Sequence, residues 1–295
     1  MNDSQRGLLL ALAAYGIWGC FALFFHLVKH IPAVEVLGHR VLWSLIFVAI
    51  VLSVTRQWKK VRYAFNDRRL LLLLAGSSCM IAINWVLYIW AVGAGRAVEA
   101  SLGYFINPLV AVALAVIFLK ETLFGFQKIA IGLALAGVGY KLISVGELPW
   151  ISLTLATTFA FYGLIRKQTQ VDAVSGLFIE TLILVPAALV YLSYLLLAGT
   201  GSSLSSYDWG LLMLSGIITA LPLIAFSAAA KHLSLTVLGF MIYLAPSLQL
   251  LSAVLILGEP FNQDDWVTFA LIWAGLIVFS GGAALKHQRS RTKHS

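Results

Sequence analysis

The stretch EASLGYFINPLVAVALAVIFLKE, residues 99–121, is a long apolar run that is interrupted by Asn107-Pro108 and closed by a carboxylate. The chain repeats this pattern 138 residues later as TVLGFMIYLAPSLQLLSAVLILGEP, residues 236–260. A proline and a glutamate recur at matching positions, namely Pro108 with Pro246 and Glu121 with Glu259.

The same offset continues without a gap from Leu73 to Gly137, which correspond to Leu211 and Gly275. Single matches are weak evidence in an apolar chain, because Leu and Ala coincide by chance. A common register over the whole stretch, with a proline and a glutamate in it, indicates an internal duplication. We therefore divide the chain into a first half, residues 1–145, and a second half, residues 146–295, within a single membrane domain.

The composition indicates a membrane protein. Hydrophobic residues make up 61% of the chain and charged residues 11%, against roughly 45–50% and 25% in soluble domains. A net charge of +8 can indicate a nucleic-acid partner, but here the charge lies between apolar segments, so we explain it by topology and expect no nucleic acid. Cys20 and Cys79 lie inside apolar segments, without CxxC or zinc-site spacing.

A spanning helix needs about 20 mostly apolar residues. Ten segments satisfy this rule, so we predict an all-α integral membrane protein with ten transmembrane helices. Their predicted ranges are 7–28, 34–54, 70–92, 97–118, 126–145, 148–165, 173–198, 208–229, 234–257 and 265–285. The first is too long for a signal peptide, and we expect it to be retained. The longest connection, Thr55 to Arg69, is rich in Lys and Arg, and we interpret it as a topology anchor rather than a short helix on the lipid surface.

The distribution of Lys and Arg predicts the orientation. If the N-terminus, every second loop and the C-terminus share one side, that side holds sixteen of the twenty basic residues. We therefore predict a cytoplasmic (inner) membrane protein with both termini in the cytoplasm. Each half then has five helices, an odd number, so the two halves enter the membrane from opposite sides. Two inverted five-helix repeats are typical of secondary transporters, which bind substrate near the bilayer midplane.

Arg40 lies about 9 Å into the second predicted helix, beside His39. An arginine at the centre of a membrane helix costs about 2.5–3.5 kcal/mol, and it keeps its charge, so it must face protein or a water-filled cavity. Two interpretations stay open: a substrate-binding side chain, or a structural one that reaches the membrane surface or backbone carbonyls. His39 follows Glu35 by four residues, so a local pair also explains it, and we expect no metal site there.

Glu180 lies at a similar depth in the seventh predicted helix, but toward the opposite membrane face. We therefore expect no direct salt bridge between Arg40 and Glu180. Because a carboxyl group can gain and lose a proton, Glu180 is the first candidate for proton coupling, and His39 is the second. The alternative is that a basic group near the cytoplasmic end holds Glu180 in a structural ion pair.

Amides and aromatic side chains with a polar tip complete the candidate site. Asn84 and Tyr88 share a helix face, and Asn84 corresponds to Pro222 under the 138-residue offset, so the two halves are interrupted at matching positions. Such aromatic residues suit an amphiphilic solute, although ordinary packing explains many of them equally well. The predicted substrate-binding residues are Trp18, His39, Arg40, Asn84, Tyr88, Tyr104, Asn107, Tyr162, Glu180 and Tyr243.

Enzymatic signatures are absent from the sequence, which contains no GxSxG, HExxH or Walker loop. The loops are too short to form a nucleotide-binding domain. We therefore expect neither enzyme activity nor a cofactor, and uphill transport would draw on an ion gradient or on exchange.

Several blocks of the sequence resemble a known family. They are LLALAAYGIWG (9–19), HRVLWS (39–44), NWVLYIWAV (84–92), EASLGYFINPLV (99–110), FAFYGLIRK (159–167) and IETL (179–182). They resemble the EamA family of the drug/metabolite transporter superfamily, and especially its RarD type, which is named for an association with chloramphenicol sensitivity. The resemblance implies a secondary carrier in the cytoplasmic membrane that exports or exchanges small metabolites or drugs.

We therefore expect a secondary transporter that works by alternating access, with a small molecule and the lipid bilayer as its partners. The competing hypotheses are a passive channel, another non-transport membrane protein and, less favoured, a membrane-embedded enzyme. The sequence assigns no oligomeric state and no coupling ion.

Overall fold

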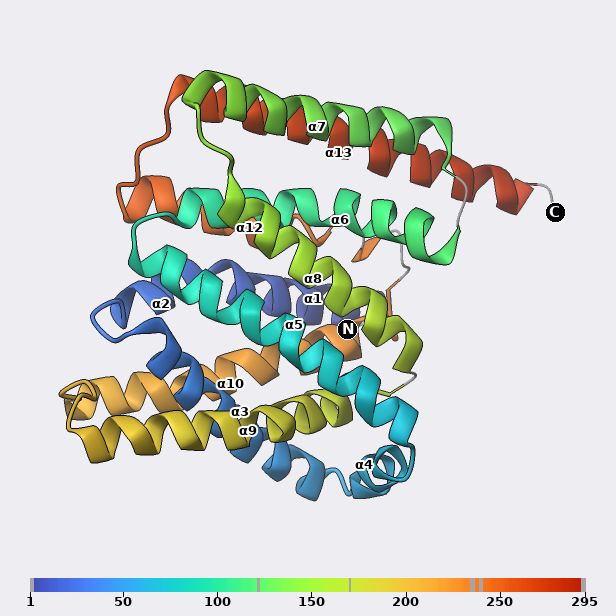
Figure 1. Ribbon diagram of the computed structural model, residues 1–295. Helices are drawn as coiled ribbons and strands as arrows, with labels where there is room; N and C mark the ends of the chain where they lie inside the picture. Colours follow the sequence, from blue (N-terminus) through green and yellow to red (C-terminus); the bar gives the residue numbers. More distant parts are fainter. Residues whose placement is uncertain (1–2, 121–122, 170, 234–236, 239–240, 293–295) are drawn as a thin grey trace.

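The computed structural model describes residues 3–120, 123–169, 171–233, 237–238 and 241–292 (Figure 1). Every regular element in these residues is a helix, which confirms the predicted all-α class for this part of the chain. The elements are α1 (Asp3–Gly19), α2 (Phe21–Leu27), α3 (Ala33–Val54), α4 (Trp58–Phe65), α5 (Arg68–Gly93), α6 (Ala97–Leu119), α7 (Gly125–Val145), α8 (Trp150–Thr169), α9 (Ala173–Ala198), α10 (Ser206–Ala229), α12 (Leu244–Leu251), the π-helical turn η1 (Ser252–Ile256) and α13 (Gln263–Thr292).

Eight helical segments of the described chain are long and apolar enough to cross a membrane. They are Gln5–Leu27, Ala33–Val54, Arg68–Gly93, Ala97–Phe118, Gly125–Ser144, Ala173–Ala198, Ser206–Ala229 and Gln263–Gly282. Each coincides with one of the ten predicted spans. The first of them is divided, because α1 ends at Gly19 and α2 begins at Phe21.

Two predicted spans are not among these eight. Residues 148–165 fall in α8, a 20-residue helix whose last turn carries Arg166 and Lys167. Residues 234–257 lie partly outside the described residues, and the described part forms a shorter apolar helix over Leu244–Ile256. Both segments are helical where they are described, but neither is a long apolar helix.

The basic connection between α3 and α5 forms the short helix α4, which we had not favoured from the sequence. Val61 and Ala64 are buried on one side of α4, where they join an apolar cluster with Leu177 and Phe178 of α9. Lys60 on the exposed side lies 3.5 Å from the Asp172 carboxylate. The apolar side of this segment packs on α9, so the basic connection is a short docked helix.

The long helices pack mainly across the boundary between the two predicted halves. α3 packs on α9, and α7 lies beside α13 at one edge of the molecule (Figure 1). α1 packs on α10 and α12, while α8 packs on α5 and α6. α1 is the first helix of the first half, and α8 is the first helix of the second half. The first helix of each half therefore packs on two helices of the other half.

A close contact between α7 and α13 shows the same reciprocity. A Cβ atom at Gly137 would lie 3.1 Å from the carbonyl oxygen of Thr268, and one at Gly275 would lie 2.9 Å from the carbonyl oxygen of Ala130. Gly137 and Gly275 are 138 residues apart in the sequence, and so are Ala130 and Thr268. The contact maps onto itself under the sequence offset, as an internal twofold axis requires.

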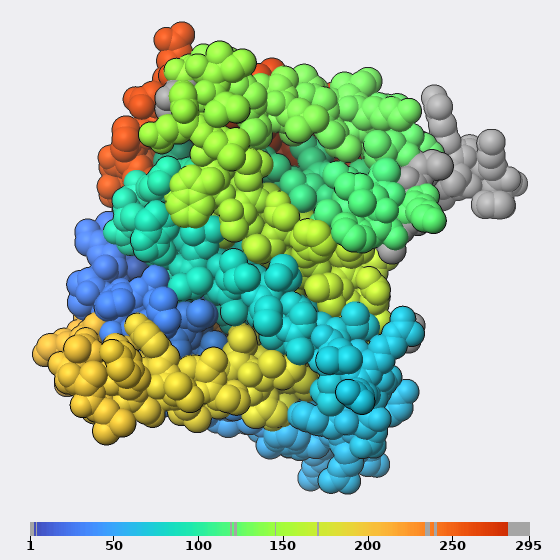
Figure 2. All heavy atoms as spheres, in the orientation of Figure 1, coloured from blue at the N-terminus to red at the C-terminus, as the bar shows by residue number. Residues whose placement is uncertain are grey.

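Large apolar side chains lie on the outer surface as well as in the core. Figure 2 shows one face of that surface with all heavy atoms drawn. Ile143, Leu196 and Leu197 each expose more than four fifths of their side-chain surface. Exposed apolar area on this scale is unfavourable in water and is the expected surface of a protein in lipid.

Gly216 provides a test of the packing between α10 and α3. A Cβ atom there would lie 2.3 Å from the carbonyl carbon of Trp43 and 2.5 Å from the amide nitrogen of Ser44. These are backbone atoms, so Gly216→Ala must push the two helices apart, and we expect it to lower the free energy of unfolding by about 1–3 kcal/mol.

The matched control is Gly210→Ala on the same helix, where a Cβ atom would meet no heavy atom within 4 Å. Alanine favours a helix over glycine by up to about 1 kcal/mol, so the control should be neutral or stabilising. Unfolding of the purified variants in detergent, followed by circular dichroism, measures both. Equal stability of the two variants would contradict the close approach of α10 to α3.

Candidate functional site

Arg40 lies deep in the bundle and is enclosed mainly by aromatic rings. Its side chain is 2% exposed, and its Nε donates a hydrogen bond to the hydroxyl of Thr219 on α10 at 2.7 Å. The guanidinium carbon lies 4.1 Å from the centre of the Trp85 ring, 5.2 Å from that of Phe25 and 5.5 Å from that of Phe21. Arg40 is therefore enclosed by the bundle and does not reach its outer surface, which was one form of the structural interpretation.

The guanidinium also has an unused donor. Its Nη1 is buried without a hydrogen-bond partner, and so is the hydroxyl of Tyr88, which belongs to the same cluster. The Tyr88 ring centre lies 6.1 Å from that of Phe25 and 5.7 Å from that of Tyr104, so both tyrosines belong to this cluster. In the described residues no carboxylate lies within 4.0 Å of Arg40. The ion pairs found there all join other residues. Arg40 has one hydroxyl and three rings around it, and no counterion.

Asn84 holds α5, α6 and α8 together next to this cluster. Its amide nitrogen donates to the carbonyl of Leu155 at 2.9 Å and to the hydroxyl of Thr158 at 3.0 Å. Its amide oxygen accepts a hydrogen bond from the hydroxyl of Tyr104 at 2.9 Å. One turn later on the Tyr104 helix, Asn107 donates to the carbonyl of Ala156 at 3.0 Å.

The two amides therefore join α5 and α6 to α8, beside the cluster that contains Arg40. Packing between helices explains the contacts of Asn84 and of Tyr104, and this is the alternative to substrate binding that the sequence allows. Tyr88 differs from both, because its hydroxyl is buried and unpaired.

Glu180 lies in a second polar cluster. Its side chain is 1% exposed, and it accepts hydrogen bonds from the hydroxyl of Ser77 at 2.6 Å and from that of Tyr162 at 3.4 Å. The Nε of Arg166 lies 3.6 Å from the same carboxylate. The structure thus supplies the basic partner that the structural interpretation of Glu180 requires, although the sequence analysis had counted Arg166 only as a topology charge.

Arg40 and Glu180 occupy equivalent positions in the two halves. Each is seven residues after the first residue of its helix, Ala33 in α3 and Ala173 in α9. Each is bonded to a hydroxyl on the third long helix of the other half, Thr219 of α10 for Arg40 and Ser77 of α5 for Glu180. Their partners are separate, in agreement with the expectation that the two charges do not form a salt bridge.

Three predicted residues make no hydrogen bond, ion pair or ring contact with Arg40 or Glu180 in the described chain. His39 packs edge-on against Trp209, with ring centres 5.1 Å apart. Trp18 packs against Tyr15 and Phe226, and Tyr243 precedes α12. Trp18 and Tyr243 both pack on the apolar core that contains Phe25 and Tyr88. The structure therefore brings Tyr88, Tyr104 and Asn84 close to Arg40 and Tyr162 to Glu180.

Glu35, which we had considered as the local partner of His39, bonds to a loop instead. Its carboxylate accepts hydrogen bonds from the backbone amide of Ser202 at 3.3 Å and from the Ser202 hydroxyl at 2.7 Å. The spacing of four residues places Glu35 and His39 on one face of the helix. The hydrogen-bond donors to the Glu35 carboxylate nevertheless come from the loop after α9.

A small cavity of about 200 Å³ lies at one end of the bundle, between the loops that precede α6, α8 and α13. Glu259 lines it and accepts hydrogen bonds from the backbone amides of Ala97 and Val98, both at 2.8 Å. Beside it, Arg96 pairs with Glu99 at 2.6 Å. Glu259 therefore clamps the first turn of α6 to the second half, a role that the sequence offset did not reveal. Its repeat partner, Glu121, lies outside the described residues.

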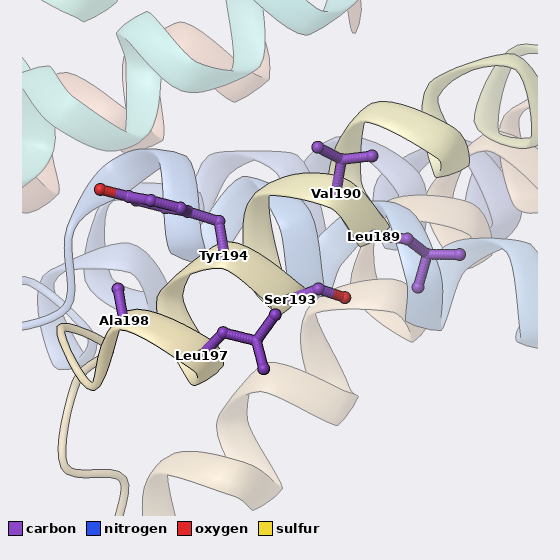
Figure 3. A pocket seen from close by; sticks show the side chains of 6 residues that line it. All are labelled: Leu189, Val190, Ser193, Tyr194, Leu197 and Ala198. Atoms are coloured by element: carbon purple, nitrogen blue, oxygen red, sulfur yellow. The ribbon is translucent and has the colours of Figure 1, made fainter.

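A second hollow is a shallow apolar groove along α9 (Figure 3). The side chains that line it are Leu189, Val190, Ser193, Tyr194, Leu197 and Ala198. Leu197 and Tyr194 are among the most exposed apolar side chains of the chain. The lining is apolar apart from the hydroxyl groups of Ser193 and Tyr194.

Comparison with known proteins places these features in a family. The model of the EamA-like transporter family matches residues 5–141 and 148–281 of the chain. The chain is 43% identical to Protein RarD of Escherichia coli (strain K12) over 98% of both chains. It is 42% identical to an uncharacterized transporter of Vibrio cholerae, over 95% of this chain and 93% of the relative. It is 35% identical to the chloramphenicol-sensitive protein RarD of Pseudomonas aeruginosa, over 94% of each.

A protein of known crystal structure shares the fold. It is 19% identical in sequence, and the superposition has a TM-score of 0.59 and covers 97% of this chain and 98% of the other. At this level of identity the likeness concerns the fold alone.

The contact between Arg166 and Glu180 can be tested by a double-mutant cycle. Removing one member of a buried pair leaves the other charge without compensation. We therefore expect Arg166→Gln and Glu180→Gln to be strongly non-additive, with a coupling free energy of about 1 kcal/mol or more in unfolding experiments.

The control is the same cycle on Lys60 and Asp172, whose side chains are 55% and 34% exposed. An exposed pair is worth about 0–1 kcal/mol, so its coupling should be smaller. Additive effects at Arg166 and Glu180 would show that the two side chains do not stabilise each other.

Proposed function

Since the chain belongs to the EamA-like transporter family, as its sequence blocks indicated, we propose that it is a secondary transporter for a small organic solute. In this proposal it works by alternating access between two inverted five-helix halves, residues 1–145 and 146–295. It exports or exchanges its solute across the cytoplasmic membrane, with both termini in the cytoplasm, as the distribution of Lys and Arg indicates.

The observation that carries the proposal is the buried polar cluster between the halves. Arg40 of α3 meets Thr219 of α10 from the other half, and Trp85 of α5 covers the guanidinium. A charged group deep inside a membrane bundle is costly and marks a substrate or ion pathway by default. Secondary transporters hold their solutes at the place where their repeats meet.

The division into ten spans and two halves has three supports. The family model matches two stretches that fall on either side of residues 142–147. The contacts of α1 with α10 and α12 are repeated by α8 with α5 and α6. The contact at Gly137 and Gly275 is reciprocal under the 138-residue offset. In this proposal the eight long apolar helices are eight of ten spans. The other two spans are α8 and the segment that contains α12 and η1.

Energy coupling is part of the same proposal. Exchange needs no titratable group, whereas proton coupling needs one inside the membrane. Glu180 and His39 are the candidates for that role. The ion pair with Arg166 favours a structural Glu180, so we propose exchange as the principal mode.

Counterflow distinguishes a carrier from a channel. Purified protein is screened by thermal shift against amino acids, vitamins and antibiotics, with chloramphenicol among them, and each stabilising solute is tested in proteoliposomes. In vesicles preloaded with unlabelled solute, a carrier takes unlabelled solute outward as its site turns from the inside to the outside. The site can then bind labelled solute and carry it inward. We therefore expect uptake of labelled solute to be several-fold faster in preloaded vesicles than in empty ones.

A passive channel would show no acceleration by preloading, because its solute flux depends only on the gradient. Protein-free liposomes and liposomes with heat-inactivated protein give the background. Equal uptake rates with and without preloading, for every stabilising solute, would reject the carrier.

A further inference from the structure

We propose that Arg40 binds the anionic group of the transported solute, so that the substrate is a small organic oxyanion with an apolar body. This inference rests on the proposed transporter function and names its substrate class. The site comprises Arg40 and Tyr88 as donors, with Phe21, Phe25 and Trp85 as the apolar wall.

The first step of the argument is the charge of Arg40. A guanidinium stays protonated in proteins, and burial of an ion at low dielectric is strongly unfavourable unless an opposite charge compensates it. Arg40 is 2% exposed, and its protein partners are one hydroxyl and three aromatic rings. Aromatic rings and a hydroxyl compensate only part of a positive charge.

The second step is a comparison with the buried carboxylates of the same chain. Glu35 accepts hydrogen bonds from Ser202, Glu180 is paired with Arg166, and Glu259 accepts two backbone amides. Asp208, at the start of α10, is paired with His30 at 3.0 Å. In the described chain each of these buried acids has compensating donors, whereas Arg40 has no acid.

The third step is the set of unused donors. The Nη1 of Arg40 and the hydroxyl of Tyr88 are both buried without a partner. The two residues pack on the same ring, that of Phe25, whose centre lies 5.2 Å from the guanidinium carbon of Arg40 and 6.1 Å from the ring centre of Tyr88. A carboxylate has two oxygens that accept charge-assisted hydrogen bonds, so one oxyanion can satisfy the two donors together.

The fourth step is the position of the cluster. α2, α3 and α5 of the first half and α10 of the second half surround Arg40. A movement of one half against the other therefore changes access to the guanidinium. The aromatic wall suits an aromatic or aliphatic body on the solute, because rings bury apolar area beside the charged group.

The test measures thermal unfolding of the purified full chain in nanodiscs at constant ionic strength. The probes are benzoate, phenylacetate and indole-3-acetate, each beside its neutral amide, and phenyl phosphate. We expect at least one acid to raise the unfolding midpoint by about 2–4 °C at saturating concentration, and its amide to have no effect. The comparison of phenyl phosphate with the carboxylates shows which oxyanion the site takes.

Arg40→Gln should abolish the rise caused by the acid, and Arg40→Lys should weaken the apparent affinity by about 10-fold or more, because it keeps the charge and loses the planar donor pair. The matched control is Arg62→Gln on the exposed side of α4, which removes the same charge outside the bundle and should keep the full rise. In the absence of any probe, Arg40→Gln should unfold at the same temperature as the wild type or higher, because it removes an uncompensated buried charge.

Three results would overturn the inference: amides that stabilise as well as their acids, an acid effect that survives in Arg40→Gln, or no stabilisation of the wild type by any oxyanion probe. The contrast between acid and amide in the wild type does not depend on the folding of any variant. If neutral amides bind and show counterflow, the proposed transporter function is retained and only the proposed anionic substrate is rejected. Acid binding at Arg40 without counterflow would reject the transporter and keep the site.

Discussion

Hydrocarbon offers no hydrogen-bond partner, so a polar group inside the bundle depends on partners within the protein. Many buried hydroxyls bond to a carbonyl of their own helix, as Ser78 does to Leu74, whereas several amides and charged groups bond to the other half. Asn84 of α5 bonds to the backbone of α8, Gln249 of α12 donates to the carbonyl of Trp18 at 2.9 Å, and Glu180 of α9 meets Ser77 of α5. The polar contacts therefore connect the halves to each other.

This arrangement suits a carrier. Glycine contacts such as Gly137 against Thr268 bring the helices of the two halves close together. The Glu259 clamp consists of two hydrogen bonds to the first turn of α6, and two hydrogen bonds can be exchanged for others at modest free energy. In our account the solute supplies, at Arg40, the charge that the protein does not.

Much of the fold could be predicted from the sequence, because it depends on local patterns. The runs of about 20 apolar residues predicted eight helices that the structure contains, and the 138-residue offset relates the contact of Gly137 with Thr268 to that of Gly275 with Ala130. The break at Cys20 was not predicted, because the apolar run continues through it. The helix α4 was not favoured either, because its stability depends on the surface of α9, which is more than 100 residues away in sequence.

The candidate site was only partly predictable for the same reason. Buried charge identified Arg40 and Glu180 as the residues that need an explanation, and helical spacing placed Asn84 and Tyr88 on one face. Neither pattern indicates which residue of another helix lies opposite. Arg166 was therefore missed as the partner of Glu180, and Glu35 bonds to a loop instead of His39.

Alternating access between the halves is tested most directly by two distances in one sample. Spin labels at Ala94 and Gln263 report on the end that contains Glu259, and labels at Gln168 and Lys231 report on the opposite end. The account predicts that Glu259→Gln, which removes the clamp on α6, lengthens the first distance and shortens the second. Two distances that stay unchanged, or that lengthen together, would contradict alternating access.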